Sequence, residues 1–357
     1  MAEFLRAGNC HAGALARTDG NMNVLHVGMG KTGTTSLQLY VFPSLILKGV
    51  IKAYNPPPLH ILLDNAVNGL VQESELAPLA FAQERMLISN ETLLEWDPAL
   101  WEASADRLLR VFGRDAIILI TLRAPRPYLR SLYQQMLHHG KIRPPEDFFL
   151  PSQTYRAVRR FLRPGELDAI DVDDFDMVHM VSLFTARFSR VVLVPIETIG
   201  ELRFLSAIWG ISDDVRAQLA TDFSSAPRAN TSYSRLAVRL TLGRERLLSA
   251  FGVQSASSSN MQMHKALAHA RGEVMPVRSR ILVSWHKLMV LLSRYGPRTG
   301  YQLPENLYLG RHMARNEAFY RSVREASDGY LSFLDGEANG CTPSALTASE
   351  VDSASCS

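Results

Sequence analysis

The chain has 357 residues, of which 46% are hydrophobic and 20% are charged, and its formal net charge is +3. These values are ordinary for a globular protein, and so small a net charge argues against a coat that binds nucleic acid. The length allows one large core with an elaborated second lobe. The three cysteines, Cys10, Cys341 and Cys356, lie near the ends, which excludes a metal-ligand cluster and a disulfide framework.

Residues 1–21 and 336–357 are rich in small and polar residues without periodicity, which predicts a loose N-terminus and a disordered tail around a domain of residues 22–335. The N-terminal stretch lacks the unbroken apolar segment of a secretory signal. The longest apolar run, Ile281 to Leu292, is interrupted by three polar residues, so it is too short and too polar to cross a bilayer. We therefore expect a cytoplasmic protein with no integral membrane segment.

Short apolar runs alternate with helical patterns along the first two thirds of the chain. The apolar runs at residues 23–27, 85–89, 116–122 and 191–195 predict strands. Helices are predicted at residues 34–47, 98–112, 125–139, 175–188, 201–209 and 213–220. This alternation is typical of an α/β fold with a central parallel sheet flanked by helices. From about residue 227 to 335, patterns at residues 232–251, 277–294 and 314–331 predict a C-terminal helical cap.

The segment from Val24 to Leu37, VLHVGMGKTGTTSL, has the pattern of a strand, a glycine-broken loop and the start of a helix. Such a segment directs unpaired backbone N–H groups at an anion, and glycines let the backbone approach it closely. The predicted anion-binding residues of this loop are Gly30, Lys31, Thr32, Gly33, Thr34, Thr35 and Ser36.

The loop resembles a Walker A element but departs from it in the position of its lysine. Gly28-xxxx-Gly33 is followed by Thr34-Thr35 in place of Lys-Ser/Thr, and the lysine lies upstream, at position 31. In a nucleotide triphosphatase the lysine neutralises the β- and γ-phosphates and the hydroxyl holds magnesium. A displaced lysine therefore indicates a nucleotide with its charges placed differently.

A second candidate site follows the strand at residues 116–122, which ends in Arg123. In a magnesium-dependent P-loop enzyme this strand would end in an acidic residue that organises the metal. Arginine instead presents a planar fork that suits two phosphate oxygens, and Ser131 lies eight residues further, on the following helix. Alternatively, both residues have purely structural roles, in which Arg123 pairs with a neighbouring acid and Ser131 lies on a helix surface.

Taken together, Lys-Thr-Gly-Thr-Thr-Ser and Arg-Ala-Pro with a serine eight residues after the arginine resemble the sulfotransferase family, most closely its bacterial members. The resemblance implies a P-loop-like sulfotransferase fold and the donor 3′-phosphoadenosine 5′-phosphosulfate (PAPS), with no metal required. It implies that Lys31 and the hydroxyls after it hold the 5′-phosphosulfate, and that Arg123 and Ser131 hold the 3′-phosphate.

Sulfuryl transfer needs a base that takes the acceptor's proton, and Glu91 is our candidate because it follows a predicted strand at the edge where α/β sheets bind ligands. Several sulfotransferases place a glutamate base after the first loop. Alternatively, Glu91 caps the next turn or pairs with Arg85. Cytosolic relatives use a histidine, and His60 is the positional competitor, whereas His138 and His139 are expected to stabilise a helix end.

The sequence leaves the acceptor and two other functions open. The acceptor is a small molecule or a carbohydrate with a hydroxyl or amine, and the oligomeric state is undetermined. A P-loop kinase of small molecules is the second hypothesis, which predicts magnesium dependence and ATP binding. A third is a non-catalytic nucleotide-binding protein that keeps the donor site without a working base.

Overall fold

The computed structural model describes residues 23–57, 59, 62, 63, 72, 75, 85–159, 169–226, 232–251, 277–297 and 299–334. A six-stranded sheet with the order β2-β3-β1-β4-β7-β8 forms its centre. The strands are β1 (Val24–His26), β2 (Ala53–Tyr54), β3 (Met86–Ser89), β4 (Ile117–Leu122), β7 (Arg190–Pro195) and β8 (Leu331–Leu334). Every neighbouring pair is parallel except β7 with β8. The predicted α/β fold with a mostly parallel sheet flanked by helices is thus confirmed.

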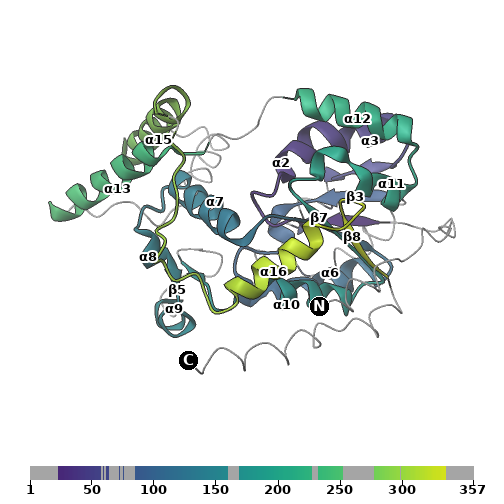
Figure 1. Ribbon diagram of the computed structural model, residues 1–357, viewed down its shortest axis with the longest axis horizontal. Coiled ribbons are helices and arrows are strands. Elements are labelled where there is room, and N and C mark those ends of the chain that lie inside the picture. The colour runs from purple at the N-terminus through teal and green to yellow at the C-terminus, as the bar shows by residue number, and fades with distance from the viewer. Residues whose placement is uncertain are drawn as a thin grey trace, which may run out of the picture.

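Helices cover both faces of the sheet because successive side chains of a strand point to opposite faces. In β4, Ile118 and Ile120 belong to one buried cluster, whereas Ile117 and Leu119 belong to the other. The first cluster packs against α6 (Trp101–Phe112), α7 (Pro125–His138), α10 (Met177–Thr185) and α16 (Met313–Arg324). The second packs against α3 (Phe42–Leu47), α11 (Arg203–Trp209) and α12 (Asp213–Ser225), so the three layers visible in Figure 1 follow from the strand pattern.

The helix predicted at residues 34–47 is present but changes its winding in the middle. It consists of α2 (Thr34–Ser36), a π-helical turn η1 (Leu37–Val41) and α3, without a break in the chain. The change precedes Pro43, which lacks an N–H and would collide with the carbonyl of residue 39 in a regular α-helix. We attribute the wider turn to this proline.

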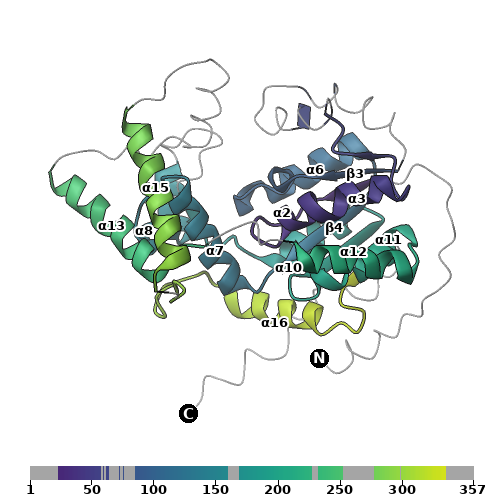
Figure 2. The same ribbon diagram turned by 90° about the horizontal axis from the view of Figure 1, so that it is seen from above.

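A two-helix lobe extends from the sheet domain and is built from α13 (Arg235–Ala250) and α15 (Val277–Tyr295), which we call the helical hairpin (Figures 1 and 2). The two helices run antiparallel. Ser234 at the start of α13 donates its N–H to Ser293 Oγ near the end of α15, at 2.8 Å, and Trp285 Nε1 donates to Thr241 Oγ1 at 3.2 Å. The hairpin packs on α7, because Gln134 donates to the Tyr233 carbonyl at 3.0 Å.

Smaller elements complete the described part of the chain between β3 and α12. They are η3 (Glu91–Leu93), η4 (Pro98–Leu100), α8 (Pro145–Phe148), α9 (Ser152–Arg159) and η5 (Ile199–Glu201), with β5 (Phe149–Leu150) and β6 (Ile170–Asp171) paired in a separate two-stranded sheet.

The predicted helix at residues 314–331 is wrong over its last turns. α16 ends at Arg324, and the chain then turns at Gly329, where φ is 72°, into β8. β8 pairs antiparallel with β7 at the edge of the sheet. Among the residues that the structure describes after 231, α13 and α15 form the helical cap, whereas α16 covers a face of the sheet.

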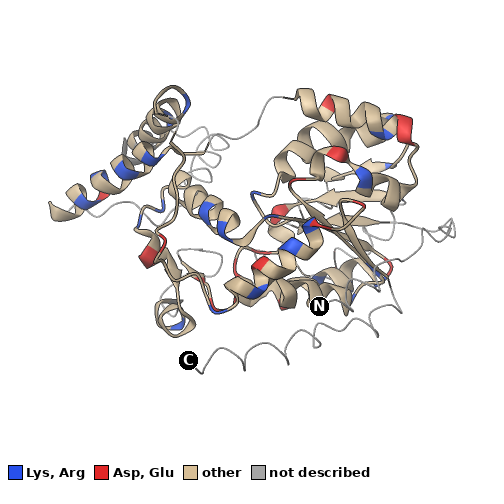
Figure 3. Ribbon diagram, in the orientation of Figure 1, with Lys and Arg blue, Asp and Glu red and all other residues tan. Residues whose placement is uncertain are grey.

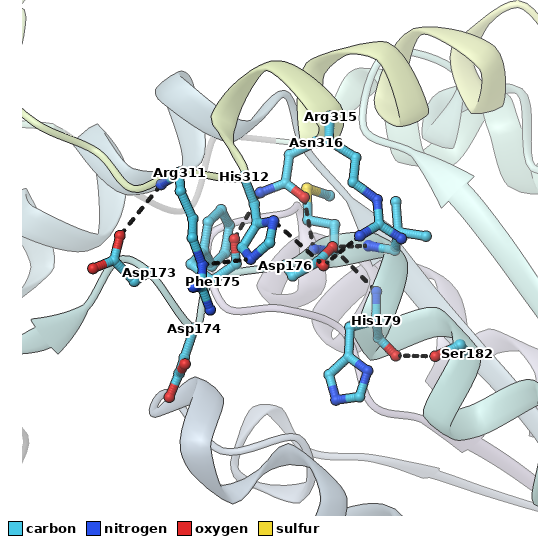
Figure 4. Close-up of polar contacts among 12 residues, drawn as sticks. Asp173, Asp174, Phe175, Asp176, His179, Ser182, Arg311, His312, Arg315 and Asn316 are labelled. Atoms are coloured by element: carbon cyan, nitrogen blue, oxygen red, sulfur yellow. Dashed lines mark hydrogen bonds and ion pairs between the residues drawn. The ribbon is translucent and has the colours of Figure 1, made fainter. Parts of the chain in front are cut away.

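A polar network fixes α16 against the start of α10 (Figure 4). Asp176 caps α10 by accepting from the N–H groups of Val178 and His179, and its other oxygen accepts from Arg315 at 3.0 Å. Asn316, which is completely buried, accepts from the Met177 N–H at 2.8 Å and donates to the Phe175 carbonyl at 2.7 Å. Because buried polar groups need partners, this pairing specifies how the two helices dock.

Some predictions fall on residues outside the described part of the chain. These are the loose termini at residues 1–21 and 336–357 and the alternative base His60. Among the described helices, none has both the length and the apolar character that crossing a bilayer requires.

Candidate functional site

The candidate site lies at the carboxyl edge of the sheet, where β1 stands between β3 and β4. After β1 the chain passes to the face covered by α3, whereas after β3 and β4 it passes to the face covered by α6 and α7. Connections that leave neighbouring strands toward opposite faces open a crevice at the strand ends, and ligands of open α/β sheets bind there. The predicted loop, Glu91 and Arg123 all follow these three strands.

His26, the last residue of β1, joins the three strands just before the loop. Its Nδ1 is 2.7 Å from Ser89 Oγ of β3, and its Nε2 is 3.2 Å from Thr121 Oγ1 of β4. The side chain is buried, and burial lowers its pKa from 6.5 to about 3. A neutral imidazole therefore anchors the base of the loop, a role that sequence analysis did not assign to it.

Two glycines of the loop lie where no larger residue fits. A β-carbon on Gly28 would lie 2.3 Å from Thr121 Oγ1, and one on Gly30 would lie 2.2 Å from the ring of Trp96. Gly33 precedes α2 with φ at 87°, a left-handed conformation that glycine adopts without strain. The glycines thus fix a compact loop at the start of the helix.

The backbone of Lys31 adopts a conformation that residues other than glycine rarely take. Its φ is 69°, in the left-handed region, which costs on the order of 1–2 kcal/mol for an L-residue. The half-buried ammonium has a pKa below its usual value, chiefly because of burial and also because of Arg123, although the nearby Glu91 carboxylate opposes the shift. Strained backbone conformations persist only where the surrounding structure enforces them, and they are frequent at functional sites.

The hydroxyls after Lys31 differ in what they can do. The Thr32 side chain is completely buried and bonds the Met29 carbonyl and, at 2.7 Å, Thr121 Oγ1, so its hydroxyl stabilises the loop. Thr34 donates to the Glu91 carboxylate. Thr35 and Ser36 have no hydrogen-bond partner for their hydroxyls among the described residues. The sequence alone does not distinguish these roles.

Two backbone N–H groups at the start of α2 make no hydrogen bond within the helix. The first helical hydrogen bonds run to the Gly33 carbonyl from the N–H groups of Ser36 and Leu37, at 3.1 and 3.2 Å. The N–H groups of Thr34 and Thr35 come before this point and take no part in the helix ladder. They therefore add dipolar donors next to the Lys31 charge.

Glu91 approaches the loop from β3. It begins the 3₁₀ turn η3, but that turn is capped by Asn90, whose side chain accepts from the Thr92 N–H, so Glu91 is not the cap. The structure describes both Glu91 and Arg85 and places no ion pair between them. The Glu91 carboxylate instead accepts from Thr34 and interacts electrostatically with Lys31.

Arg123 reaches the same loop from the end of β4. Its Nη1 donates to the Lys31 carbonyl at 3.2 Å, which uses one of the five N–H groups of the guanidinium. Burial and the charge of Arg130 lower the pKa of the half-buried Arg123, while Glu197 opposes that shift. The two predicted cationic sites therefore lie next to each other.

Ser131 lies on α7, and its hydroxyl has no hydrogen-bond partner among the described residues. The structure does not show it in contact with Arg123 or with the loop. Arg126 and Arg130 of the same helix are engaged elsewhere, with the Pro304 carbonyl at 2.7 Å and the Gln302 amide oxygen at 2.6 Å.

Two histidines at the end of α7 lie closer to the site than the sequence indicated. Burial lowers the pKa of His138 to about 3 and that of His139 to about 4, and the Lys31 charge contributes to both shifts. Both imidazoles are therefore neutral at pH 7. The adjacent pair of histidines was visible in the sequence, but only the fold brings the end of α7 toward the loop.

No protein-family model matches the chain, and no curated protein or solved structure matches it with statistical significance. The described residues contain no group of three or more His, Cys, Asp or Glu side chains arranged to hold a metal ion.

Proposed function

We propose that this protein is a PAPS-dependent sulfotransferase that transfers a sulfuryl group to a hydroxyl or amine acceptor. The observation that carries the proposal is the contact between the Arg123 guanidinium and the Lys31 carbonyl, 3.2 Å apart. It brings together two cationic groups from neighbouring strands at the edge where α/β sheets bind ligands. A nucleotide with phosphates at both its 3′ and 5′ positions requires two such groups.

The loop suits the 5′-phosphosulfate end of this donor. The loop leads directly into α2, and the hydroxyls of Thr35 and Ser36, which have no partner among the described residues, supply donors beside the helix N-terminus. In the proposal, Lys31 supplies the positive charge that stabilises the phosphate as it becomes the leaving group. The remaining guanidinium donors of Arg123 and the unused hydroxyl of Ser131 suit the 3′-phosphate.

In the proposed reaction the acceptor oxygen forms a bond to sulfur while the bond from sulfur to the bridging phosphate oxygen breaks. The acceptor's proton passes to Glu91, and the negative charge that develops on the leaving phosphate is stabilised by Lys31. The hydrogen bond from Thr34 to Glu91 fixes the carboxylate beside the loop, which is the location that a base requires.

Two features favour this proposal over a magnesium-dependent kinase. The strand that would carry the metal-organising acid ends in Arg123, whose fixed positive charge repels a cation. The loop lysine at position 31 also comes before Gly33, whereas a Walker A lysine follows it.

The proposal is tested by calorimetric titration of the protein with 3′-phosphoadenosine 5′-phosphate, ADP and ATP, with and without magnesium. We expect the first to bind roughly tenfold or more tightly than ADP without magnesium, because one charged contact contributes about 1.5–3 kcal/mol. In Arg123→Ala this preference should disappear, whereas Arg203→Ala, in an exposed ion pair with Glu201, is the matched control.

Tighter binding of ATP that depends on magnesium would replace the proposal with the kinase hypothesis. Binding of 3′-phosphoadenosine 5′-phosphate without any consumption of PAPS would favour a non-catalytic nucleotide-binding protein. The second outcome is measured by following release of the 3′,5′-bisphosphate product in the presence of candidate acceptors.

A further inference from the structure

The helical hairpin exposes a stripe of large apolar side chains on α13. Leu236, Leu240, Leu247 and Phe251 have exposed fractions between 37% and 76%. At about 100° per residue these four positions fall within about 60° of arc on the helix surface. The buried residues Ala237, Val238 and Thr241 lie on a different side of the helix, so the stripe is separate from the packed face.

A second stripe runs along α15. Ile281, Leu288, Leu291 and Tyr295 have exposed fractions between 52% and 75%, and they fall within about 80° of arc. Burial of such residues would release about 25 cal/mol for each square ångström of apolar surface. Two long exposed stripes on adjacent helices indicate an interaction surface.

The two stripes lie on one face of the hairpin. The helices meet through Trp285, which bonds Thr241 and lies under the Arg244 guanidinium at 5.3 Å. Viewed along the axis of either helix, the centre of the stripe lies about 80° away from this contact. On both helices the stripe lies on the side that is reached by rotating backward, toward lower residue numbers. Because the helices are antiparallel, equal offsets place both stripes on the same side, and we call these eight residues the hairpin face.

Exposed cations border this face on both outer edges. Arg235, Arg239 and Arg246 lie beyond the stripe of α13, on the side away from α15. Lys287 and Arg294 occupy the equivalent outer edge of α15. Figure 3 shows that Lys and Arg predominate on the two helices.

Acidic residues are almost absent from the same helices. Glu245 is the only acid among the hairpin side chains that the structure describes, and it lies about 150° from the centre of the α13 stripe. A second copy of the chain would bring the same cations to this face without acids to pair with them. Charge complementarity therefore requires an anionic partner.

We propose that the hairpin face docks on the surface of a bilayer that contains anionic lipids. Apolar side chains in the middle and cations at the edges match the two layers of such a surface, since the apolar residues enter the acyl boundary while Lys and Arg reach the phosphates. Attraction to anionic lipid adds roughly 1 kcal/mol for each basic residue near the surface. This docking depends on neither the donor nor the acceptor of the proposed reaction.

The test is sedimentation of the full chain with vesicles of phosphatidylcholine alone and of phosphatidylcholine mixed with phosphatidylglycerol. We expect binding to the mixed vesicles that weakens steeply as salt is raised, and little binding to the neutral ones. Arg239→Ser combined with Arg246→Ser should weaken binding roughly thirtyfold, because two basic residues are removed.

Leu240→Glu combined with Leu247→Glu should abolish vesicle binding. Leu47→Glu, at an 87% exposed position of α3 on the sheet domain, is the matched control and should bind as the unchanged protein does. Circular dichroism and nucleotide titration establish that each variant is folded, and both should be unaffected.

Three outcomes would overturn the proposal. One is failure of the unchanged protein to sediment with mixed vesicles, and another is equal loss of binding in Leu47→Glu. The third is a dimer, detected by light scattering, that the Leu240→Glu and Leu247→Glu pair dissociates, which would make the hairpin face an interface between copies of the chain.

Discussion

The buried imidazole of His26 predicts that the free energy of unfolding falls at acid pH. It also predicts that substitution of His26 removes part of this fall. In the folded state its pKa is about 3, because burial opposes the charged form, whereas an exposed histidine has a pKa of 6.5. Below pH 6.5 the unfolded chain therefore binds a proton at this position that the folded chain does not. Stability is highest above pH 6.5 and falls as the pH decreases.

The magnitude follows from the two pKa values. At pH 5 the folded imidazole still carries almost no proton, so the loss depends on the 1.5 units between pH 5 and the ordinary pKa of 6.5. At 1.36 kcal/mol per unit, His26 alone removes about 2 kcal/mol from the free energy of unfolding between pH 8 and pH 5. His138 and His139, whose pKa values are also lowered, add to the loss in the same direction.

The contribution of His26 is isolated by comparison with His26→Asn, which keeps a polar side chain but cannot be protonated. Urea unfolding at pH 8 and pH 5, followed by circular dichroism, gives the free energy of unfolding of each protein. We expect the unchanged protein to lose about 2 kcal/mol more than the variant, since the other histidines are common to both. His179→Asn, at an exposed position, is the control. An identical pH dependence in the unchanged protein and His26→Asn would refute the reasoning.

Three further predictions concern the loop and its neighbours. Glu91→Gln should lower the rate of PAPS consumption about a hundredfold or more and leave the dissociation constant of 3′-phosphoadenosine 5′-phosphate unchanged; normal turnover would remove Glu91 from the role of base. Arg123→Lys keeps the charge but loses the planar fork, so calorimetry should show roughly tenfold weaker binding of the 3′,5′-bisphosphate and no change for ADP; an equal loss for both nucleotides would argue against the assigned 3′ site. Gly30→Ala places a β-carbon 2.2 Å from the Trp96 ring and should lower the free energy of unfolding by about 1–3 kcal/mol, and Trp96→Leu in the same chain should restore part of it; a fully stable Gly30→Ala would show that the loop packing is looser than described.

The elements that the sequence predicted correctly are those with a long, unambiguous pattern. β4 has six consecutive buried residues, five of them apolar, and α7 starts at Pro125 and carries a long amphipathic pattern. β2, with two residues, is too short to show any period. The segment of β8, Leu-Ser-Phe-Leu, extends an amphipathic helical pattern, and only its pairing with β7 decides that it becomes an edge strand.

The candidate site was predictable in its residue types but not in its internal contacts. Glycines and a lysine between a strand and a helix indicate an anion loop, whereas the left-handed backbone of Lys31 has no sequence signal because glycine or asparagine usually takes it. The burial of Thr32 depends on Thr121 of a distant strand. A signal for His26 did exist, since a histidine inside an apolar strand needs polar partners, and Ser89 and Thr121 lie within the strands beside it.

The helix α7 connects the candidate site to the helical hairpin. It starts two residues after Arg123, and the ring of His138 at its far end packs 4.1 Å from that of Tyr233, where the helical hairpin begins. With fourteen residues and a rise of about 1.5 Å per residue, α7 is about 21 Å long. Its two prolines both lie in the first turn, so its remaining length holds no residue that interrupts helical winding. The helix α7 thus links the strand end that carries Arg123 to the start of the helical hairpin, and an insertion of a single residue into α7 would rotate the residues after it by about 100° around the helix axis.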